Sequence, residues 1–87
     1  MRRDYQTTRE FDRSFKRLPK RIQSDVLEKV ERFFDDPTHP SLRVKRIRGI
    51  ERIWEMSITM NYRLTFEMDE ERVLLRKIGT HDVLRRP

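Results

Sequence analysis

Large apolar residues alternate with polar ones along two neighbouring segments in the second half of the chain, Trp54–Ile58 and Tyr62–Phe66. A period of two is typical of half-buried β-strands, in which successive side chains point to opposite faces of a sheet. Pairing the apolar faces of the two strands leaves a three-residue loop, Thr59-Met60-Asn61. Asn61 tolerates the left-handed backbone that such a loop requires.

The same pairing predicts which polar side chains share the outer face of this hairpin. Ser57 lies opposite Arg63, and Glu55 lies diagonally across from Arg63. We therefore expect an arginine that points outward from a strand, where the backbone limits its movement.

The first half of the chain predicts two amphipathic helices, because apolar residues recur there every three or four positions. The first helix begins at a capping box formed by Thr7 and Glu10, and it ends at Pro19. The second ends before Pro37, since the residue that precedes a proline is disfavoured in a helix. The apolar positions of both, which we expect in the core and not on a base-stacking surface, are Phe11, Phe15, Leu18, Ile22, Val26, Val30, Phe33 and Phe34.

Three further segments are predicted as strands, and they complete an α+β fold in which two N-terminal helices pack on a small antiparallel β-sheet. Residues 1–6 form a short edge strand, and residues 41–48 alternate roughly before a tight turn at Gly49. A polar turn at 69–71 leads into the last strand, 73–78, in which two adjacent leucines leave the inward face undecided. Whether Arg76 or Lys77 points to the polar face therefore stays open.

The length of the chain and its net charge limit the kind of site and the kind of partner that we expect. A chain of 87 residues buries only about 60–65% of its unfolded surface, so we expect residues 1–87 to form one domain with an open site. Its formal charge of +6 favours a polyanionic partner, above all nucleic acid. The sequence contains no cysteine, no apolar signal segment and no run of transmembrane length. We expect a cytoplasmic protein with no membrane association.

Two histidines are the candidates for proton transfer, because histidine is the residue type that ordinarily titrates near neutral pH. His81 follows a glycine at the end of the last strand, where a side chain projects toward a cleft, although a role in a turn is equally compatible with this place. His39 lies in a loop before Pro40 and is interpreted as a surface residue. No ligand spacing indicates a metal site.

A basic sheet face with one histidine suits cleavage of RNA without a metal or other cofactor. Such a reaction needs a base for the 2′-hydroxyl proton, cations for the phosphate and an acid for the departing 5′-oxygen. Guanidinium groups fit the phosphate, so Arg63 is the first choice, with Lys45 and Lys77 as possible helpers. Residues 41–48 contain no acid and form either a solvated face or a phosphate-binding one. The candidate RNA-binding residues are Arg43, Arg46, Arg48, Arg76, Arg85 and Arg86.

The order of elements resembles the RelE/ParE superfamily of bacterial toxins over essentially the whole chain. The motifs that carry this resemblance are Leu18-Pro19, Asp36-Pro37, His39-Pro40, Tyr62-Arg63-Leu64 and Gly79-Thr80-His81-Asp82-Val83-Leu84. The ending is most similar to the RelE and YafQ types. The resemblance implies the toxin of a type II toxin-antitoxin system, a ribosome-dependent, metal-independent mRNA endonuclease. Its implied partners are the ribosome, mRNA and a cognate antitoxin in a hetero-oligomer.

The resemblance also assigns roles to single residues. Arg63 matches the active-site arginine of RelE-like toxins, and His81 matches the C-terminal histidine of YafQ-like ones. Lys45, Asn61 and Lys77 stand where YafQ-type toxins have a histidine, an aspartate and an arginine. Glu55 and Ser57 stand where RelE has paired lysines, so the identity of the general base stays open. His81 is the acid or the base, and the alternatives to it are Lys45, Glu55 and Lys77. The alternatives are a ParE-like inhibitor of DNA gyrase and a non-enzymatic RNA-binding module.

Overall fold

Helices and strands alternate along residues 4–87, the part of the chain that the computed structural model describes. Met1–Arg3, which the sequence assigned to the first strand, lie outside the described residues. The elements are β1 (Asp4–Thr7), α1 (Arg9–Arg17), α2 (Lys20–Asp35), the 3₁₀-helix η1 (Pro40–Leu42), β2 (Lys45–Ile47), β3 (Ile50–Ser57), β4 (Tyr62–Met68), β5 (Arg72–Thr80) and the 3₁₀-helix η2 (His81–Leu84).

The sheet has the order β1-β5-β4-β3-β2, with β1 at one edge as predicted. The strands β2 to β5 pair antiparallel, whereas β1 runs parallel to β5. The α+β class with two helices packed on the sheet is confirmed, but the sheet is mixed and not wholly antiparallel. Parallel neighbours need a long connection, and nearly the whole chain lies between β1 and β5.

The central hairpin has the predicted register. Ser57 pairs with Arg63, and the backbone N–H of Ile58 donates to the carbonyl of Tyr62 at 3.0 Å, which closes the three-residue loop. Gly49 makes the predicted turn between β2 and β3 with a φ of +86°, a conformation that glycine adopts without steric cost.

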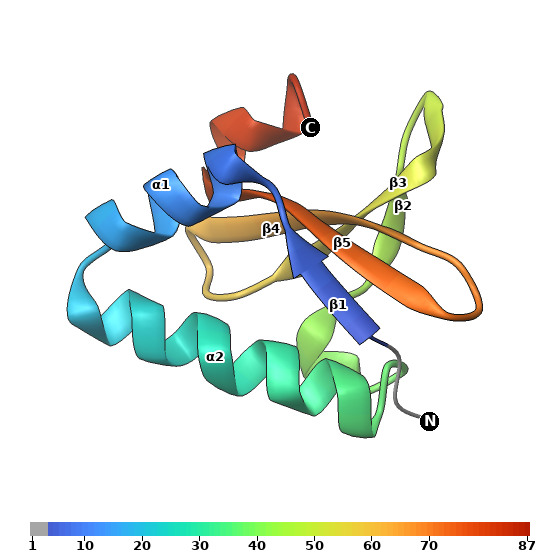
Figure 1. Ribbon diagram of the computed structural model, residues 1–87, viewed down its shortest axis with the longest axis horizontal. Helices are drawn as coiled ribbons and strands as arrows, with labels where there is room; N and C mark the ends of the chain where they lie inside the picture. The colour runs from blue at the N-terminus through green and yellow to red at the C-terminus, as the bar shows by residue number, and fades with distance from the viewer. Residues whose placement is uncertain (1–3) are drawn as a thin grey trace.

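Neighbouring residues of β4 show what covers each face of the sheet. The ring of Phe66 lies 5.1 Å from that of Phe33 in α2, whereas the hydroxyl of Thr65 donates to the carbonyl of Pro87 at 3.2 Å. Successive side chains of a strand point to opposite faces. Therefore α2 covers one face, and the C-terminal segment lies on the other (Figure 1).

The core forms between α2 and the sheet. Val26, Phe33 and Phe66 are at most 1% exposed, which confirms the predicted stripe of α2. Burying a side chain of this kind contributes about 1.5–3 kcal/mol relative to leaving it in water. The predicted aromatic core thus holds the sheet against α2 and leaves the opposite face for other contacts.

Helix α1 begins one residue later than predicted. Its cap is Thr8, whose hydroxyl oxygen accepts from the backbone N–H of Phe11 at 3.0 Å. Thr7 pairs with Leu75 in the parallel ladder, so its backbone belongs to β1. The predicted capping box is therefore wrong, and the carboxylate of Glu10 pairs with Lys77 at 3.2 Å.

A bulge in β5 explains why the pattern left the facing of this strand undecided. Thr65 pairs with Lys77 and Phe66 with Leu75, so Arg76 is an extra residue without a partner in the register. A bulge reverses the inward and outward positions that follow it.

Candidate active site

A cleft of about 390 Å³ opens on the side of the sheet opposite α2. Its walls come from the segment before β2, from β2, β3 and β4, and from η2. The residues that line it are Arg43, Val44, Lys45, Glu55, Ser57, Arg63, His81 and Leu84. The cleft brings together four of the six predicted catalytic residues and one of the predicted RNA-binding arginines.

The strand register places the polar residues on one face of the sheet. Lys45 pairs with Glu55 across β2 and β3, and Ser57 pairs with Arg63 across β3 and β4. Residues two apart on a strand share a face, so these two cross-strand pairs lie next to each other. The alternation visible in the sequence is therefore sufficient to assemble this wall.

Arg63 is held by the loop that its own hairpin forms. Its Nη1 donates to the carbonyls of Thr59 at 2.7 Å, Met60 at 3.0 Å and Tyr62 at 3.1 Å. Within residues 4–87, no hydrogen bond or ion pair engages its Nε or Nη2. One nitrogen thus fixes the half-buried guanidinium, and the edge formed by the other two is available to an anion.

Glu55 is the buried carboxylate of the cleft. It is only 8% exposed, and the described part of the chain gives it no hydrogen bond or ion pair. Burial of a carboxylate without a partner is costly, so such groups are rare outside functional sites. The hairpin pattern predicted its position, but its burial depends on packing that the pattern does not contain.

His81 is the first residue of η2 and lines the cleft from the side opposite the strands. Its side chain is exposed, and no residue between 4 and 87 forms a hydrogen bond with it. The imidazole is therefore free to exchange a proton with a molecule in the cleft.

Arg43 reaches the cleft from an unusual backbone conformation. It caps the C-terminus of η1 with a φ of 48° and a ψ of 45°, in the left-handed region that non-glycine residues seldom adopt. Its backbone N–H donates to the carbonyl of Pro40 at 3.2 Å, so the conformation closes the end of η1.

Two predicted catalytic residues lie outside the cleft. Asn61 is exposed at the tip of the central hairpin, where its backbone N–H donates to the hydroxyl of Thr59 at 3.2 Å. Lys77 pairs with Glu10 and lines a separate hollow. The bulge at Arg76 sets the direction of Lys77, which residue spacing does not reveal.

Most of the predicted RNA-binding arginines also lie elsewhere. The guanidinium of Arg46 lies over the ring of Trp54, 4.9 Å from its centroid, and Arg46 does not line the cleft. Arg76 contacts Glu67 and the carbonyl of Pro87. Three more do not line the cleft: Arg48, Arg85 and Arg86.

His39 is a capping residue and not the surface residue that its loop position suggested. It is half-buried, its Nδ1 accepts from the backbone N–H of Ser41 at 3.2 Å, and its Nε2 lies 3.1 Å from Nη1 of Arg32. These contacts join η1 to α2, and thereby support the segment that leads to Arg43.

Among residues 4–87, no three side chains of the types His, Cys, Asp and Glu gather closely enough to hold a metal ion. None of the helices in this range has the length and apolar character needed to cross a membrane.

Residues 5–84 match the family model described as the ParE toxin of the type II toxin-antitoxin system parDE. The chain belongs to this toxin family. The predicted membership of the RelE/ParE superfamily is thereby confirmed. No curated protein sequence matches this ParE-family toxin.

Solved structures share the fold of this ParE-family toxin at low identity. The Escherichia coli DinJ-YafQ toxin-antitoxin complex matches with a TM-score of 0.80 and 12% identity, over 97% of this chain and 98% of that one. The YoeB dimer from Staphylococcus aureus matches with a TM-score of 0.78 and 10% identity, over 93% of this chain and 99% of that one. The RelB-RelE complex from Methanococcus jannaschii matches with a TM-score of 0.73 and 16% identity, over 92% of this chain and 94% of that one. These three likenesses show a shared fold over nearly the whole of each chain.

Proposed function

We propose that this ParE-family toxin is a ribosome-dependent endoribonuclease that cuts mRNA with its own side chains and no metal ion. The observation that carries the proposal is the composition of one cleft. A buried carboxylate without a partner, a guanidinium fixed by carbonyls and an unbonded imidazole line the same 390 Å³. These three groups correspond to the base, the anion stabiliser and the acid that cleavage of RNA requires.

In the proposed reaction, Glu55 removes the proton of a ribose 2′-hydroxyl. The 2′-oxygen attacks the adjacent phosphorus, and the bond from phosphorus to the 5′-oxygen breaks. His81, protonated beforehand, gives its proton to the departing 5′-oxygen. The products are a 2′,3′-cyclic phosphate and a 5′-hydroxyl, and two proton transfers restore both side chains.

Arg63 stabilises the negative charge that grows on the phosphate during this reaction. Because Nη1 is already bound to three carbonyls, the guanidinium needs little reorganisation when the transition state forms. Lys45 and Arg43, both exposed at the cleft, add positive charge along the path of the RNA.

We also propose a cognate antitoxin as partner and the cytoplasm as the place of action. The matching structures from E. coli and M. jannaschii are toxin-antitoxin complexes, and the family description names such a system. A toxin with a formal charge of +6 is best neutralised by an acidic segment.

Inhibition of DNA gyrase is the second candidate function. The matching family model is that of the ParE toxin, and binding to gyrase would need no catalytic residues. The unpartnered Glu55 favours the endonuclease, because a purely binding surface gains nothing from a buried carboxylate.

One experiment separates these functions. The purified toxin is added to translating ribosomes, and the ends of the mRNA fragments are mapped by primer extension and tested for a 2′,3′-cyclic phosphate. We expect cuts that appear only on translated mRNA. Absence of cuts together with inhibition of gyrase supercoiling would overturn the proposal in favour of the second candidate.

A further inference from the structure

The position of His81 depends on the backbone of η2 alone. No hydrogen bond from residues 4–87 holds the imidazole, and η2 is only four residues long. A helical turn this short is not stable by itself, because forming the first turn fixes several residues for one hydrogen bond. Contacts at the two ends of this segment must therefore keep it at the cleft.

The first contact lies where η2 leaves the sheet. A Cβ atom added to Gly79 would lie 2.9 Å from Cγ1 of Val83, closer than real Cβ contacts come. Val83 thus packs directly on the backbone of β5, and glycine is required there for space.

The second contact lies beyond η2, at Pro87. Arg85 and Arg86 are exposed, but Pro87 is buried against the sheet. Its carbonyl accepts from the hydroxyl of Thr65 at 3.2 Å and from Nε of Arg76 at 3.0 Å. Thr65 is fully buried, so this hydrogen bond is shielded from water.

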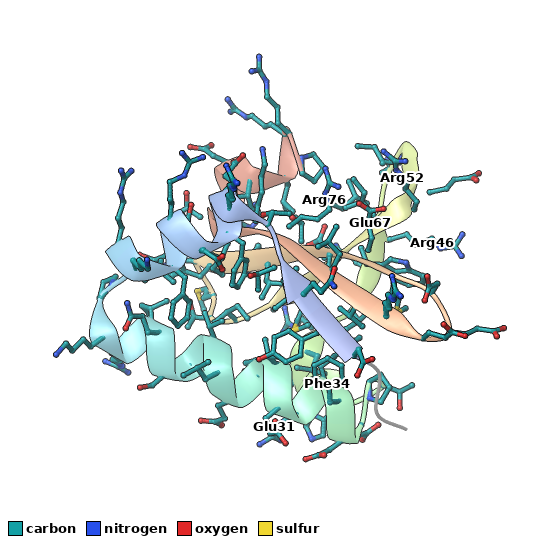
Figure 2. The ribbon with its side chains drawn as sticks, in the orientation of Figure 1. Glu31, Phe34, Arg46, Arg52, Glu67 and Arg76 are labelled. Atoms are coloured by element: carbon teal, nitrogen blue, oxygen red, sulfur yellow. The ribbon has the colours of Figure 1, made fainter. Side chains whose placement is uncertain are left out.

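Arg76 joins this contact to the sheet. Its Nη1 pairs with the carboxylate of Glu67 on β4, and both groups are less than one-third exposed. Figure 2 shows the two side chains next to each other on the side of the sheet that carries the C-terminal segment. Arg76 is also the extra residue of the β5 bulge, a feature that redirects a side chain. We use the term latch for the hydrogen bonds of Thr65 and Arg76 to Pro87 together with the ion pair of Arg76 and Glu67.

We propose that Arg76 is a positioning residue that, through the latch, holds η2 against the sheet and keeps His81 at the cleft. The inference rests on the proposed function for its catalytic part, in which His81 is the acid. It assigns to Arg76 a role other than the RNA binding that its charge suggested. Arg76 does not line the cleft, so it acts only through the segment it holds.

The first test measures the motion of the segment and needs no catalysis. Backbone ¹⁵N relaxation is recorded for Arg76→Ala and for Arg86→Ala, which removes the same charge from an exposed position. In Arg76→Ala we expect the order parameters of residues 81–86, which all carry a backbone N–H, to fall from about 0.85 to below about 0.6, with the strands unchanged. In Arg86→Ala they should stay at the value of the unaltered protein. Rigid residues 81–86 in Arg76→Ala would overturn the latch.

The second test measures cleavage on translating ribosomes. Arg76→Ala should lower kcat about a hundredfold with KM unchanged, because a small displacement of a catalytic group has an effect of this size. The double variant Arg76→Ala/His81→Ala should be no slower than His81→Ala, since Arg76 acts through His81. A raised KM with kcat unchanged, or multiplied losses in the double variant, would contradict positioning and support contact with RNA.

Thr65→Val provides a variant that keeps the charge and the core volume. It removes one donor to Pro87 but keeps Arg76, whose ion pair with Glu67 stays in place, so it should raise the motion of residues 81–86 less than Arg76→Ala does. If the unaltered toxin cuts no mRNA, the proposed function fails while the relaxation measurements still decide whether the latch holds η2. If it cuts mRNA and Arg76→Ala frees η2 without lowering kcat, the proposed function stands and the positioning role is wrong.

Discussion

The two histidines of this toxin are expected to serve different ends, one in chemistry and one in structure. His81→Ala should lower cleavage about a hundredfold to ten-thousandfold, because a positioned proton donor contributes that much, and thermal stability should hardly change. His39→Ala should leave cleavage nearly intact but lower the free energy of unfolding by about 1 kcal/mol, since it removes the cap of η1. Fragment yield on ribosomes and urea denaturation provide the two measurements.

Each histidine variant is the control for the other. Binding of the toxin to ribosomes at matched salt should be nearly the same for both, because each variant keeps every arginine and lysine of the cleft. If His81→Ala cleaves at the parental rate, then His81 is a turn residue and the acid must be another side chain of the cleft.

At the scale of single residues, the sequence predicted the strand face that a side chain occupies better than it predicted the burial and contacts of that side chain. Strand alternation correctly placed Glu55, Ser57 and Arg63 on one face, because a period of two depends on backbone geometry alone. It left open whether Arg76 or Lys77 points to the polar face, and Lys77 pairs with Glu10 beyond a bulge. A bulge arises from pairing between strands and leaves no mark in the residues of one strand.

Some secondary-structure elements are determined by their own residues, and others by contacts with distant parts of the chain. The central hairpin follows from its own pattern, and its register was predicted correctly to the residue pair. The start of α1 was predicted one residue too early, because Thr7 and Thr8 both carry a hydroxyl group that can cap a helix. The choice depends on β5, since Thr8 also donates to the carbonyl of Arg76, 68 residues away. Helix caps that are fixed by tertiary pairing cannot be read from a capping box.

The close packing of η2 on β5 leads to a prediction at the scale of elements. Gly79→Ala adds a methyl group 2.9 Å from Cγ1 of Val83, so η2 should move away from the sheet and cleavage should fall. Because Gly79 does not have a positive φ, the alanine introduces no backbone strain, and the loss comes from crowding alone. Cleavage rate and thermal unfolding measure the result.

A compensating variant separates crowding from other effects of the substitution. Val83→Ala removes the methyl group that clashes, so Gly79→Ala/Val83→Ala should regain most of the activity lost in Gly79→Ala. Losses that add in the double variant would mean that the contact between the two residues does not position η2.

At the scale of the whole molecule, the net charge follows from the composition, but the distribution of the charged side chains over the surface does not. The fold places the basic residues in separate groups: Arg43, Lys45 and Arg63 line the cleft, while Arg85 and Arg86 line a separate hollow. Arg46 stacks on Trp54. The parallel strand β1 likewise depends on the ends of the chain meeting in space. Which cations can reach one phosphate backbone is therefore a property of the fold.

The salt dependence of RNA binding tests this division of charge. Release of counterions makes the logarithm of affinity for a single strand fall with the logarithm of salt concentration, with a slope of about −0.7 for each phosphate contact. For the three cations of the cleft, a 2′-deoxy strand that cannot be cut should give a slope of about −2. Arg43→Ala/Lys45→Ala should reduce it to about −0.7, because Arg63 alone remains. Arg85→Ala/Arg86→Ala lowers the net charge of +6 by the same two units but should leave the slope unchanged. Equal reductions in both variants would mean that the RNA responds to the total charge and not to the cleft.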